Sequence, residues 1–430
     1  MLPGGVVLGS GTAPAGRKKT RIGWFRRSGQ RVDDGSVRDD DSTRRRALDE
    51  NDQVSFGSRR PDGRRPSGRL LIACGAVLAA VAAVVATLVT GHGSNPPRAQ
   101  SASTGAAGTG AVSTVEAGPR LLGVRGSWEL FGYAPGRVVR IQFASGRITQ
   151  TAVPTRSGGP VSLVVGPHEA IISHLDMVPG YLVPDGRPAR PLSGPLGNGG
   201  IAIPGPQPGT AWVQASFQAT SMPLVRMDGT ETGVSLRLPT GVTSQAFPEG
   251  YSQATSDGRG GVLVGDYTET GATYDDLRPG GIQRIAETLA AVGPTRWLAV
   301  DCPTGHRCSN IIVDTATGAR HTLPGPSAEP PPTAATGVIA PDGSAAAIYR
   351  ANGDRLTLHL LNLASGSDQQ IPVSVDAESV AGQRLAWSPD SRWLFVVTAQ
   401  GKLAAVDART GHVEGLGVSL PSLSLIAVRN

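Results

Sequence analysis

The sequence predicts an all-β fold, a β-propeller of seven four-stranded blades, preceded by one transmembrane α-helix and a disordered N-terminal tail. Three observations lead to this prediction. The chain is rich in turn-forming residues, with 58 Gly and 34 Pro among 430 residues and only 4% aromatic residues. Short turn motifs recur in its C-terminal part at a spacing of about 44 residues, which is the length of a propeller blade. One uninterrupted apolar stretch precedes them.

The positive charge of the chain belongs to its N-terminal part. Residues 1–69 hold 16 basic and 9 acidic residues, a balance of +7. The remaining 24 basic and 25 acidic residues give 70–430 a balance of −1. A domain that binds nucleic acid needs clustered cations to neutralise phosphates. We therefore expect that the larger part of the chain has no nucleic-acid partner.

Leu70 to Val89 is the candidate membrane segment. Its 20 residues, LLIACGAVLAAVAAVVATLV, include no charged side chain. At about 1.5 Å per residue, such a helix matches a hydrocarbon core about 30 Å thick. Polar, glycine-rich sequence on both sides disfavours the alternative of a buried helix in a soluble domain. We predict one helix that spans the lipid bilayer, over 69–90.

The basic residues around this helix predict its orientation. Five arginines precede it and the next basic residue after it is Arg98, and positive charge is retained on the cytoplasmic side. We predict a single-pass plasma-membrane protein with a cytoplasmic N-terminus and an extracytoplasmic C-terminal domain. A cleaved signal peptide and a lipoprotein acylated at Cys74 are lesser alternatives, because the first needs an unusually long n-region and the second needs its apolar run before the cysteine. The topology-setting arginines are Arg59, Arg60, Arg64, Arg65 and Arg69.

Two segments beside the helix are expected to lack a packed core. Residues 1–68 combine Gly, Arg, Asp and Ser with few large apolar residues, which is the composition of a disordered, basic cytoplasmic tail. Residues 91–118 are mostly Gly, Ala, Ser, Thr and Pro and form the predicted flexible linker. The propeller is expected over 119–430. The bias toward Gly, Ala, Arg and Val indicates a bacterial source.

Four short turn motifs predict hairpins within the blades. Asp or Asn can bond its own backbone two residues on, and Gly adopts positive φ, so each motif predicts a tight turn after an apolar strand. The motifs are QFASG at 142–146, DTATG at 314–318, NLASG at 362–366 and DARTG at 407–411. With three weaker copies, the final glycines are at 146, 186, 233, 280, 318, 366 and 411. A β-sandwich would not readily give seven turns at this spacing.

A second motif lies 17 to 20 residues upstream of several of these turns. Pro fixes φ at the first corner of a turn, and Asp and Gly suit the later positions, so an inner strand is expected to reverse into an apolar second strand. The copies are WSPDSRWLFVV at 387–397, APDGSAAAIY at 340–349, TSDGRGGVLV at 255–264 and GPTRWLAV at 293–300. The C-terminal segment 422–428 is expected to pair with the first blade and to close the ring.

The Ser-Pro-Asp-Gly turn followed by a short apolar strand resembles the WD40-like repeat of TolB-type β-propellers. The resemblance covers about residues 120–430 and is strongest from 290 onward. A regular Trp-Asp ending and a Gly-His opening are missing, so the chain departs from the WD40 repeat proper. The resemblance implies a propeller and leaves its ligand open.

Cys302 and Cys308 are the residues expected to form a disulfide. Cys302 follows the apolar strand 297–300 and Cys308 precedes 310–313, so the two cysteines lie across one hairpin. An oxidising compartment favours a disulfide there. Metal binding by both thiolates and His306 is the alternative, but three ligands without a fourth make a poor structural zinc site.

The sequence predicts no catalytic, cofactor-binding or metal-binding residues and no cofactor. It has no nucleophile elbow, phosphate-binding loop, zinc-protease motif or dinucleotide fingerprint. A metal site would need convergence of three scattered residues, namely His168, His174 and Asp176. The densest acidic group is expected to consist of solvated loop carboxylates that cap turns, and these are Asp266, Asp275 and Asp276.

The leading functional hypothesis is a membrane-tethered recognition module. Its propeller would bind an envelope protein or ligand, and the bilayer would hold it through one helix. The alternative is a propeller-based envelope enzyme, a hydrolase, lyase or quinoprotein-type oxidoreductase with a site at the central channel. A third possibility is transmembrane signalling through the basic tail. Polar groups gathered at one channel mouth would favour the enzyme, and a channel filled by Val, Ala and Gly would favour binding.

Overall fold

A computed structural model describes part of the second of two compact units, Ser101–Asn430. The predicted tail, the helix Leu70 to Val89, its flanking arginines and most of the linker lie outside the described residues. Within the described part, no helix is long and apolar enough to span a membrane. The described residues are 111–116, 120–154, 160–174, 178–216, 218–239, 254–268, 271–285, 288–302, 307–327, 337–352, 355–375 and 383–430.

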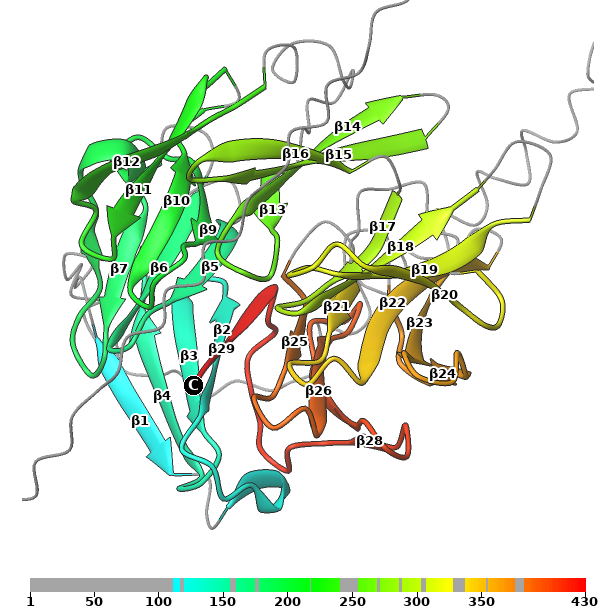
Figure 1. Ribbon diagram of the computed structural model, residues 1–430. Coiled ribbons are helices and arrows are strands. Elements are labelled where there is room, and N and C mark those ends of the chain that lie inside the picture. Colours follow the sequence, from blue (N-terminus) through cyan, green and yellow to red (C-terminus); the bar gives the residue numbers. More distant parts are fainter. Residues whose placement is uncertain are drawn as a thin grey trace, which may run out of the picture. The chain divides into compact units, whose positions relative to one another are not determined.

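The described domain is all-β, with helical structure limited in these residues to two short 3-10 turns, η1 (Leu121–Gly123) and η2 (Gly194–Leu196). Its first sheet has five strands in the order β1-β4-β3-β2-β29 and joins the two ends of the domain (Figure 1). These strands are β1 (Val112–Glu116), β2 (Glu129–Ala134), β3 (Arg137–Gln142), β4 (Arg147–Ala152) and β29 (Leu425–Arg429).

The next three sheets are antiparallel meanders of four strands each. The first of them contains β5 (Pro160–Val165), β6 (Glu169–His174), β7 (Tyr181–Pro184) and β8 (Arg190–Pro191). The second contains β9 (Ile201–Pro204), β10 (Thr210–Gln214), β11 (Ser221–Arg226) and β12 (Glu231–Arg237). The third contains β13 (Ala254–Ser256), β14 (Val262–Thr268), β15 (Gly271–Arg278) and β16 (Gly281–Ile285).

Two further meanders are joined into one eight-stranded sheet, because β17 and β21 pair in parallel. The first half contains β17 (Thr288–Val292), β18 (Arg296–Asp301), β19 (Ser309–Asp314) and β20 (Arg320–Leu323). The second half contains β21 (Gly337–Ile339), β22 (Ala345–Asn352), β23 (Arg355–Asn362) and β24 (Asp368–Ile371). The last sheet contains β25 (Leu385–Trp387), β26 (Trp393–Val397), β27 (Leu403–Asp407) and β28 (Val413–Glu414).

The sheets form a β-propeller-like ring around their inner strands. Contacts run from β29 to β5, from β5 to β9 and from β9 to β13, and then from β17 to β21, β25 and back to β29. The β13–β16 and β17–β20 meanders meet through β15 and β17. Apolar side chains from neighbouring sheets fill the space between them in separate clusters. The all-β, propeller-like architecture predicted from the sequence is therefore present.

The turn glycines lie mostly where the motifs predicted them. Gly318, Gly366 and Gly411 each follow the third strand of a meander, and Gly146 follows β3, the third strand of the first sheet counted from β29. The four glycines have φ between 66° and 72°, a backbone conformation that strains residues with a Cβ atom. One position was wrong, because Gly233 lies within β12 and not in a turn. The turn before β12 uses Asp228 and Gly229 instead, where Asp228 Oδ1 accepts the Thr230 N–H at 2.9 Å.

The C-terminal strand closes the ring, as predicted. β29 pairs antiparallel with β2 over five residues, from Glu129 opposite Arg429 to Tyr133 opposite Leu425. Part of the predicted linker 91–118 is a strand, because β1 lies within it and pairs with β4. Its VSTVE sequence supplies β-branched residues that suit an edge strand, although Val115 stays 55% exposed.

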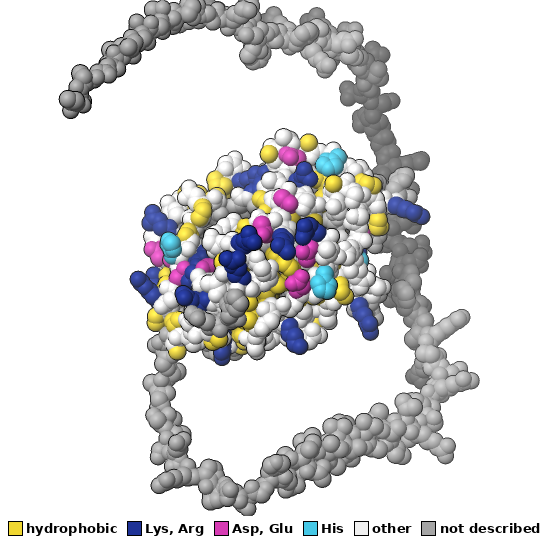
Figure 2. Space-filling model, turned by 90° about the horizontal axis from the view of Figure 1, so that it is seen from below, with side chains coloured by type: hydrophobic (Ala, Val, Ile, Leu, Met, Phe, Trp, Pro, Cys, Tyr) yellow, Lys and Arg dark blue, Asp and Glu magenta, His cyan; other side chains and the backbone are white. Residues whose placement is uncertain are grey.

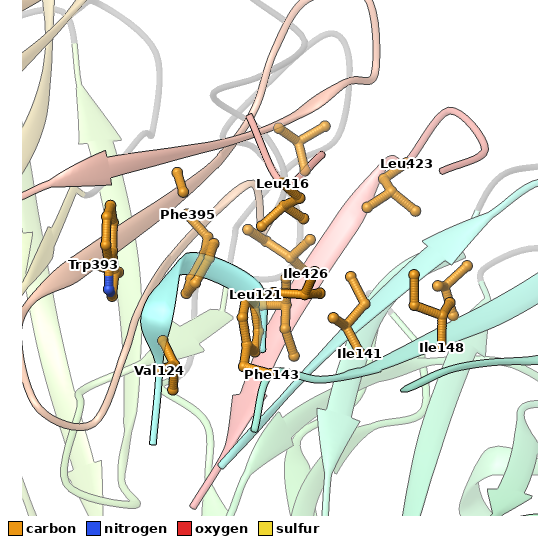
Figure 3. Packing of buried hydrophobic residues seen from close by; sticks show 14 of the residues in the cluster. Leu121, Val124, Ile141, Phe143, Ile148, Trp393, Phe395, Leu416, Leu423 and Ile426 are labelled. Atoms are coloured by element: carbon orange, nitrogen blue, oxygen red, sulfur yellow. The ribbon is translucent and has the colours of Figure 1, made fainter. Parts of the chain in front are cut away.

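The closing strand is also packed by a mixed apolar cluster. Leu121 and Val124 come from the start of the domain, whereas Trp393 and Phe395 come from β26 and Ile426 from β29. Figure 3 shows these side chains together in one cluster. The ring of Phe395 lies 5.1 Å from that of Phe143 in the β3–β4 turn, measured between centroids. Ring closure therefore buries aromatic and aliphatic groups from segments about 300 residues apart, which the hydrophobic effect favours.

Arg429 fixes the closing strand at its end. Its guanidinium pairs with the carboxylate of Glu129 on β2 and lies 2.8 Å from Oδ2 of Asp185 in the β7–β8 turn. Its Nη1 also donates to the carbonyl of Gly166 at 3.3 Å. Glu129 also accepts a hydrogen bond from Arg140 Nε at 2.9 Å. Glu129 and Arg429 are only 6% and 8% exposed, so Arg429 ties the first sheet to the second, through Asp185 and Gly166, in a largely desolvated place.

Replacement of Arg429 by Ala should lower the free energy of unfolding by about 1.5–3 kcal/mol, because Glu129 and Asp185 lose a charged hydrogen-bond partner although Glu129 keeps its bonds from Arg140. Urea unfolding followed by tryptophan fluorescence measures this change. Arg409→Ala is the matched control, since Arg409 is 77% exposed and its Nε lies 4.0 Å from Asp407. The control should change stability by less than about 0.5 kcal/mol. Equal effects of the two variants would show that Arg429 does not hold the ring closed.

Candidate functional site

Both sets of turn motifs lie at one end of the ring, which we call the motif end. Strand direction alternates in a meander, so the turn between the first and second strands and the turn between the third and fourth strands share an end. The first kind includes 257–261 before β14, 340–344 before β22 and 388–392 before β26. The second kind includes 315–319 before β20 and 408–412 before β28.

Most carboxylates at the motif end accept hydrogen bonds from backbone N–H groups of the turn in which they lie. Oδ1 of Asp314 accepts the N–H groups of Ala316 at 3.1 Å and Thr317 at 2.8 Å, together with the Thr317 hydroxyl at 2.7 Å. These bonds, first the hydroxyl and then the amide of Thr317, lower the pKa of the Asp314 carboxyl. Asp407 binds the N–H of Arg409 in the same way at 3.0 Å. Such aspartates are structural, and the prediction that they make tight turns is correct.

One group at this end differs, and we call Asp257, Arg259, Asp276 and Arg278 the acid–arginine cluster. Asp257 lies in the turn between β13 and β14 and has no exposed surface. Its Oδ1 accepts the N–H groups of Arg259 at 2.6 Å and Gly261 at 2.8 Å. Its Oδ2 lies 3.1 Å from Nη2 of Arg278. The turn motif therefore buries a carboxylate and supplies its counter-charge from β15.

Asp276 brings a second carboxyl to the same arginine. It is 1% exposed, and its Oδ2 lies 2.7 Å from Arg278 Nη2 and 3.7 Å from Arg259 Nη2. Burial, and after it the negative charge of Asp257, raise the pKa of Asp276 from 3.8 to about 7, although Arg259 opposes this. A carboxyl of this kind exchanges its proton near neutral pH, which is the property of a general acid or base.

The cluster connects two neighbouring meanders. Trp297 on β18 donates its indole N–H to the carbonyl of Asp257 at 2.9 Å. The guanidinium of Arg259 lies 5.4 Å from the Trp297 ring centroid and donates to the carbonyl of Thr315 in the β19–β20 turn. A change of protonation at Asp276 therefore acts on groups that hold this seam between sheets.

The expectation for the densest acidic group was wrong. Asp275 and Asp276 are 5% and 1% exposed and lie in strand β15, so they are not solvated loop carboxylates. Consecutive strand residues point to opposite faces, and Asp275 pairs with Arg284 at 3.1 Å, away from the acid–arginine cluster. Asp266 lies in β14 opposite Thr273. Asp257 was not predicted as a site residue from the sequence. The feature that could have indicated it is its position in the Ser-Asp-Gly turn.

The histidine pair does not converge on a metal. His168 precedes β6 and His174 ends it, which separates them by about 20 Å along the strand. His174 is 2% exposed and lies edge-on to Tyr133 and Tyr181, with ring centroids 6.4 and 6.2 Å away. Asp176 lies outside the described residues. In the described part of the chain, no three His, Cys, Asp or Glu side chains are grouped so as to hold a metal ion.

Cys302 and Cys308 are joined in a disulfide across the β18–β19 connection, with their Cα atoms 4.1 Å apart. The bond occupies both thiols, which the alternative metal site would have required. His306, the third residue of that alternative, lies outside the described residues. Cys308 also packs beside the apolar cluster between the two halves of the eight-stranded sheet.

Comparisons with known proteins indicate similarity of fold only. No family model matches the chain, and no curated protein matches it. Similar solved structures include a functionally unknown protein from Desulfotomaculum acetoxidans (12% identity, 70% of this chain and 98% of that chain, TM-score 0.45). They also include TolB from Acinetobacter baumannii (12%, 72% and 68%, 0.40) and an oligogalacturonate lyase in complex with manganese (12%, 68% and 89%, 0.44). TolB is thus among the structures that the chain resembles.

The raised pKa of Asp276 predicts a pH dependence of stability. The folded protein keeps this proton up to about pH 7, whereas the unfolded chain loses it near pH 3.8. The stabilisation from Asp276 is therefore complete below about pH 4 and is lost as pH rises through 7. Asp276→Asn should remove this loss, so the variant gains stability relative to the wild type between pH 4.5 and pH 7.5. Urea unfolding across this pH range provides the measurement.

Asp314→Asn is the control for this experiment. Its carboxyl has a lowered pKa, so its stabilising contribution is lost only as pH falls below its usual range. The stability difference between this variant and the wild type should stay constant from pH 4.5 to pH 7.5. Parallel pH profiles for Asp276→Asn and the wild type would contradict the assigned protonation of Asp276.

Proposed function

We propose that this chain is a membrane-tethered, extracytoplasmic β-propeller that recognises an envelope protein or ligand through the ends of its ring. The observation that supports it most is the composition of the seven inner strands, in which small and apolar residues predominate. In the proposed ring the eight-stranded sheet counts as two blades, which gives seven. The helix Leu70 to Val89 tethers the ring, and Arg59, Arg60, Arg64, Arg65 and Arg69 keep the tail in the cytoplasm.

The inner strands are bonded directly to one another. The N–H of Leu163 on β5 donates to Oε1 of Gln383, just before β25, at 2.7 Å, and the N–H of Ile426 on β29 donates to the Gln383 carbonyl at 2.7 Å. The N–H of Ala202 on β9 donates to the Ser162 hydroxyl at 3.0 Å. The seven inner-strand sequences are PVSLVV, IAIP, ATS, TLAAV, GVI, LAW and LIAVR. Such a centre supports recognition at the ends more than a polar catalytic channel.

The surface of the domain suits a partner of mixed charge. Figure 2 shows one face on which basic and acidic side chains lie side by side, with hydrophobic side chains between them. At the motif end, Arg392 and Arg409 both lie near Asp407 and are 47% and 77% exposed. Arginine is enriched at protein interfaces, where it combines charge with a planar stacking surface. We therefore place the recognition surface at the motif end of the last sheet.

Export of the domain can be tested with reporter fusions. Alkaline phosphatase joined after Asn430 should be active in intact cells, because that enzyme needs an oxidising compartment, and a fluorescent protein that folds only in the cytoplasm should stay dark at the same position. Both reporters joined after residue 60 should give the reverse result. A fluorescent C-terminal fusion would overturn the predicted topology.

Recognition can be tested by capture from native membranes with the tagged full-length chain as bait. Replacement of both Arg392 and Arg409 by Glu should reduce the captured partner at least about tenfold, since arginines central to an interface each contribute more than about 1 kcal/mol. Lys402→Glu is the control, because Lys402 is exposed in the β26–β27 turn at the opposite end of the ring. Unchanged capture by the double variant would exclude the motif end of this sheet.

A further inference from the structure

Four polar side chains share one face of the meander β21–β24. Arg350 on β22 lies directly opposite Thr357 on β23, and Asp368 on β24 lies opposite Leu361. Alternate residues of a strand point the same way, so Thr357, His359 and Leu361 face the same side. The register therefore gathers a hydroxyl, an imidazole, a carboxylate and a guanidinium on three adjacent strands.

Thr357, His359 and Asp368 form one hydrogen-bonded series, and Arg350 joins it through an ion pair. Oδ1 of Asp368 lies 2.8 Å from Nδ1 of His359, and Nε2 of His359 lies 3.0 Å from the hydroxyl of Thr357. The second carboxylate oxygen of Asp368 pairs with Arg350 at 2.8 Å. Arg350 is itself anchored, because its Nη1 donates to the carbonyl of Ser327. The carboxylate is thus fixed from both sides.

The two partners of His359 define its working tautomer. Asp368 can only accept a hydrogen bond in its ionised form, so Nδ1 carries the proton and Nε2 is left as an acceptor for the Thr357 O–H. The competing acceptor of that hydroxyl, the carbonyl of Arg350, is farther away at 3.3 Å. A carboxylate that orients an imidazole, which in turn accepts from a hydroxyl, is the arrangement that activates hydroxyl nucleophiles.

Solvent reaches these hydrogen-bonded side chains, whereas the two carboxyls of the acid–arginine cluster are buried. The side chains of His359 and Asp368 are 14% and 15% exposed, and Thr357 is partly exposed. Asp276 is 1% exposed. This partial exposure of all three residues is what would admit a small reagent to the Thr357 hydroxyl.

We infer that Thr357 is a base-activated nucleophile that accepts acyl groups from carboxylic esters. Its Oγ1 bonds to the ester carbonyl carbon while its proton passes to Nε2 of His359. Collapse of the tetrahedral adduct breaks the bond to the alcohol oxygen, which takes that proton and leaves as the alcohol. Water, deprotonated by the same imidazole, then releases the carboxylic acid and restores the Thr357 hydroxyl. Arg350 is a positioning residue, because it acts through Asp368. The inference does not depend on the proposed recognition function.

The test treats the purified full-length chain with p-nitrophenyl acetate. We follow nitrophenolate release and map acetylated residues by mass spectrometry of peptides. Thr357 should be acetylated at least about tenfold faster than Thr317, because a positioned general base contributes about 10²–10⁴-fold. Thr317 is the internal control, since its hydroxyl donates to Asp314 at 2.7 Å without an imidazole partner. The rate at Thr357 should rise with pH through a single ionisation.

Variants of Thr357 and His359 distinguish a reactive hydroxyl from side chains that only stabilise the fold. Thr357→Val keeps the shape of the side chain and should abolish the fast acetylation, whereas Thr357→Ser should restore it. His359→Gln should slow acetylation of Thr357 at least about tenfold and remove its pH dependence. Thermal unfolding of each variant shows whether the domain is intact. Equal acetylation of Thr357 and Thr317 in the folded wild type, or an unchanged rate in folded His359→Gln, would overturn the inference.

Discussion

The pairing of β29 with β2 is the constraint on which the rest of the domain depends. A ring of sheets is stable only when its last strand covers the open edge of its first sheet, because an unpaired edge exposes a row of backbone donors and acceptors. Here the closing strand also carries Ile426, which packs with residues from both ends of the domain, and Arg429, which ties the first sheet to the second. Hydrogen bonds, apolar packing and an ion pair therefore act together at one seam.

Burial decides what each polar group of the ring can do. In the acid–arginine cluster the two carboxyls are buried while Arg278 is 36% exposed, and the burial that raises the pKa of Asp276 keeps this carboxyl itself away from solvent. Such a group can link protonation to the stability of a seam more readily than it can meet a substrate. Thr357, His359 and Asp368 are partly exposed to solvent instead. Their proposed reactivity follows from the hydrogen bonds that orient the imidazole of His359.

The sequence predicted the tight turns of this fold, but it did not predict the side-chain clusters that join different strands. Turn glycines such as Gly318 and aspartates such as Asp314 act within four residues of themselves, so their motifs predicted turns correctly. The turn predicted at Gly233 was wrong, because the turn forms four residues earlier, at Asp228 and Gly229. The acid–arginine cluster joins residues 19 apart, and the chain of Thr357, His359 and Asp368 spans two strands, so neither has a fixed spacing to detect.

The position of β1 adds a mechanical consequence to the proposed tether. β1 is the outermost strand of the sheet whose innermost strand is β29, so both ends of the domain meet in one sheet. In a tethered protein, force from the membrane reaches β1 first and acts on its five residue pairs with β4. Ser113, Thr114 and Val115 are exposed, so little apolar burial resists the detachment of β1. The outer strand would thus yield before load reached the β29–β2 pairing that keeps the ring closed.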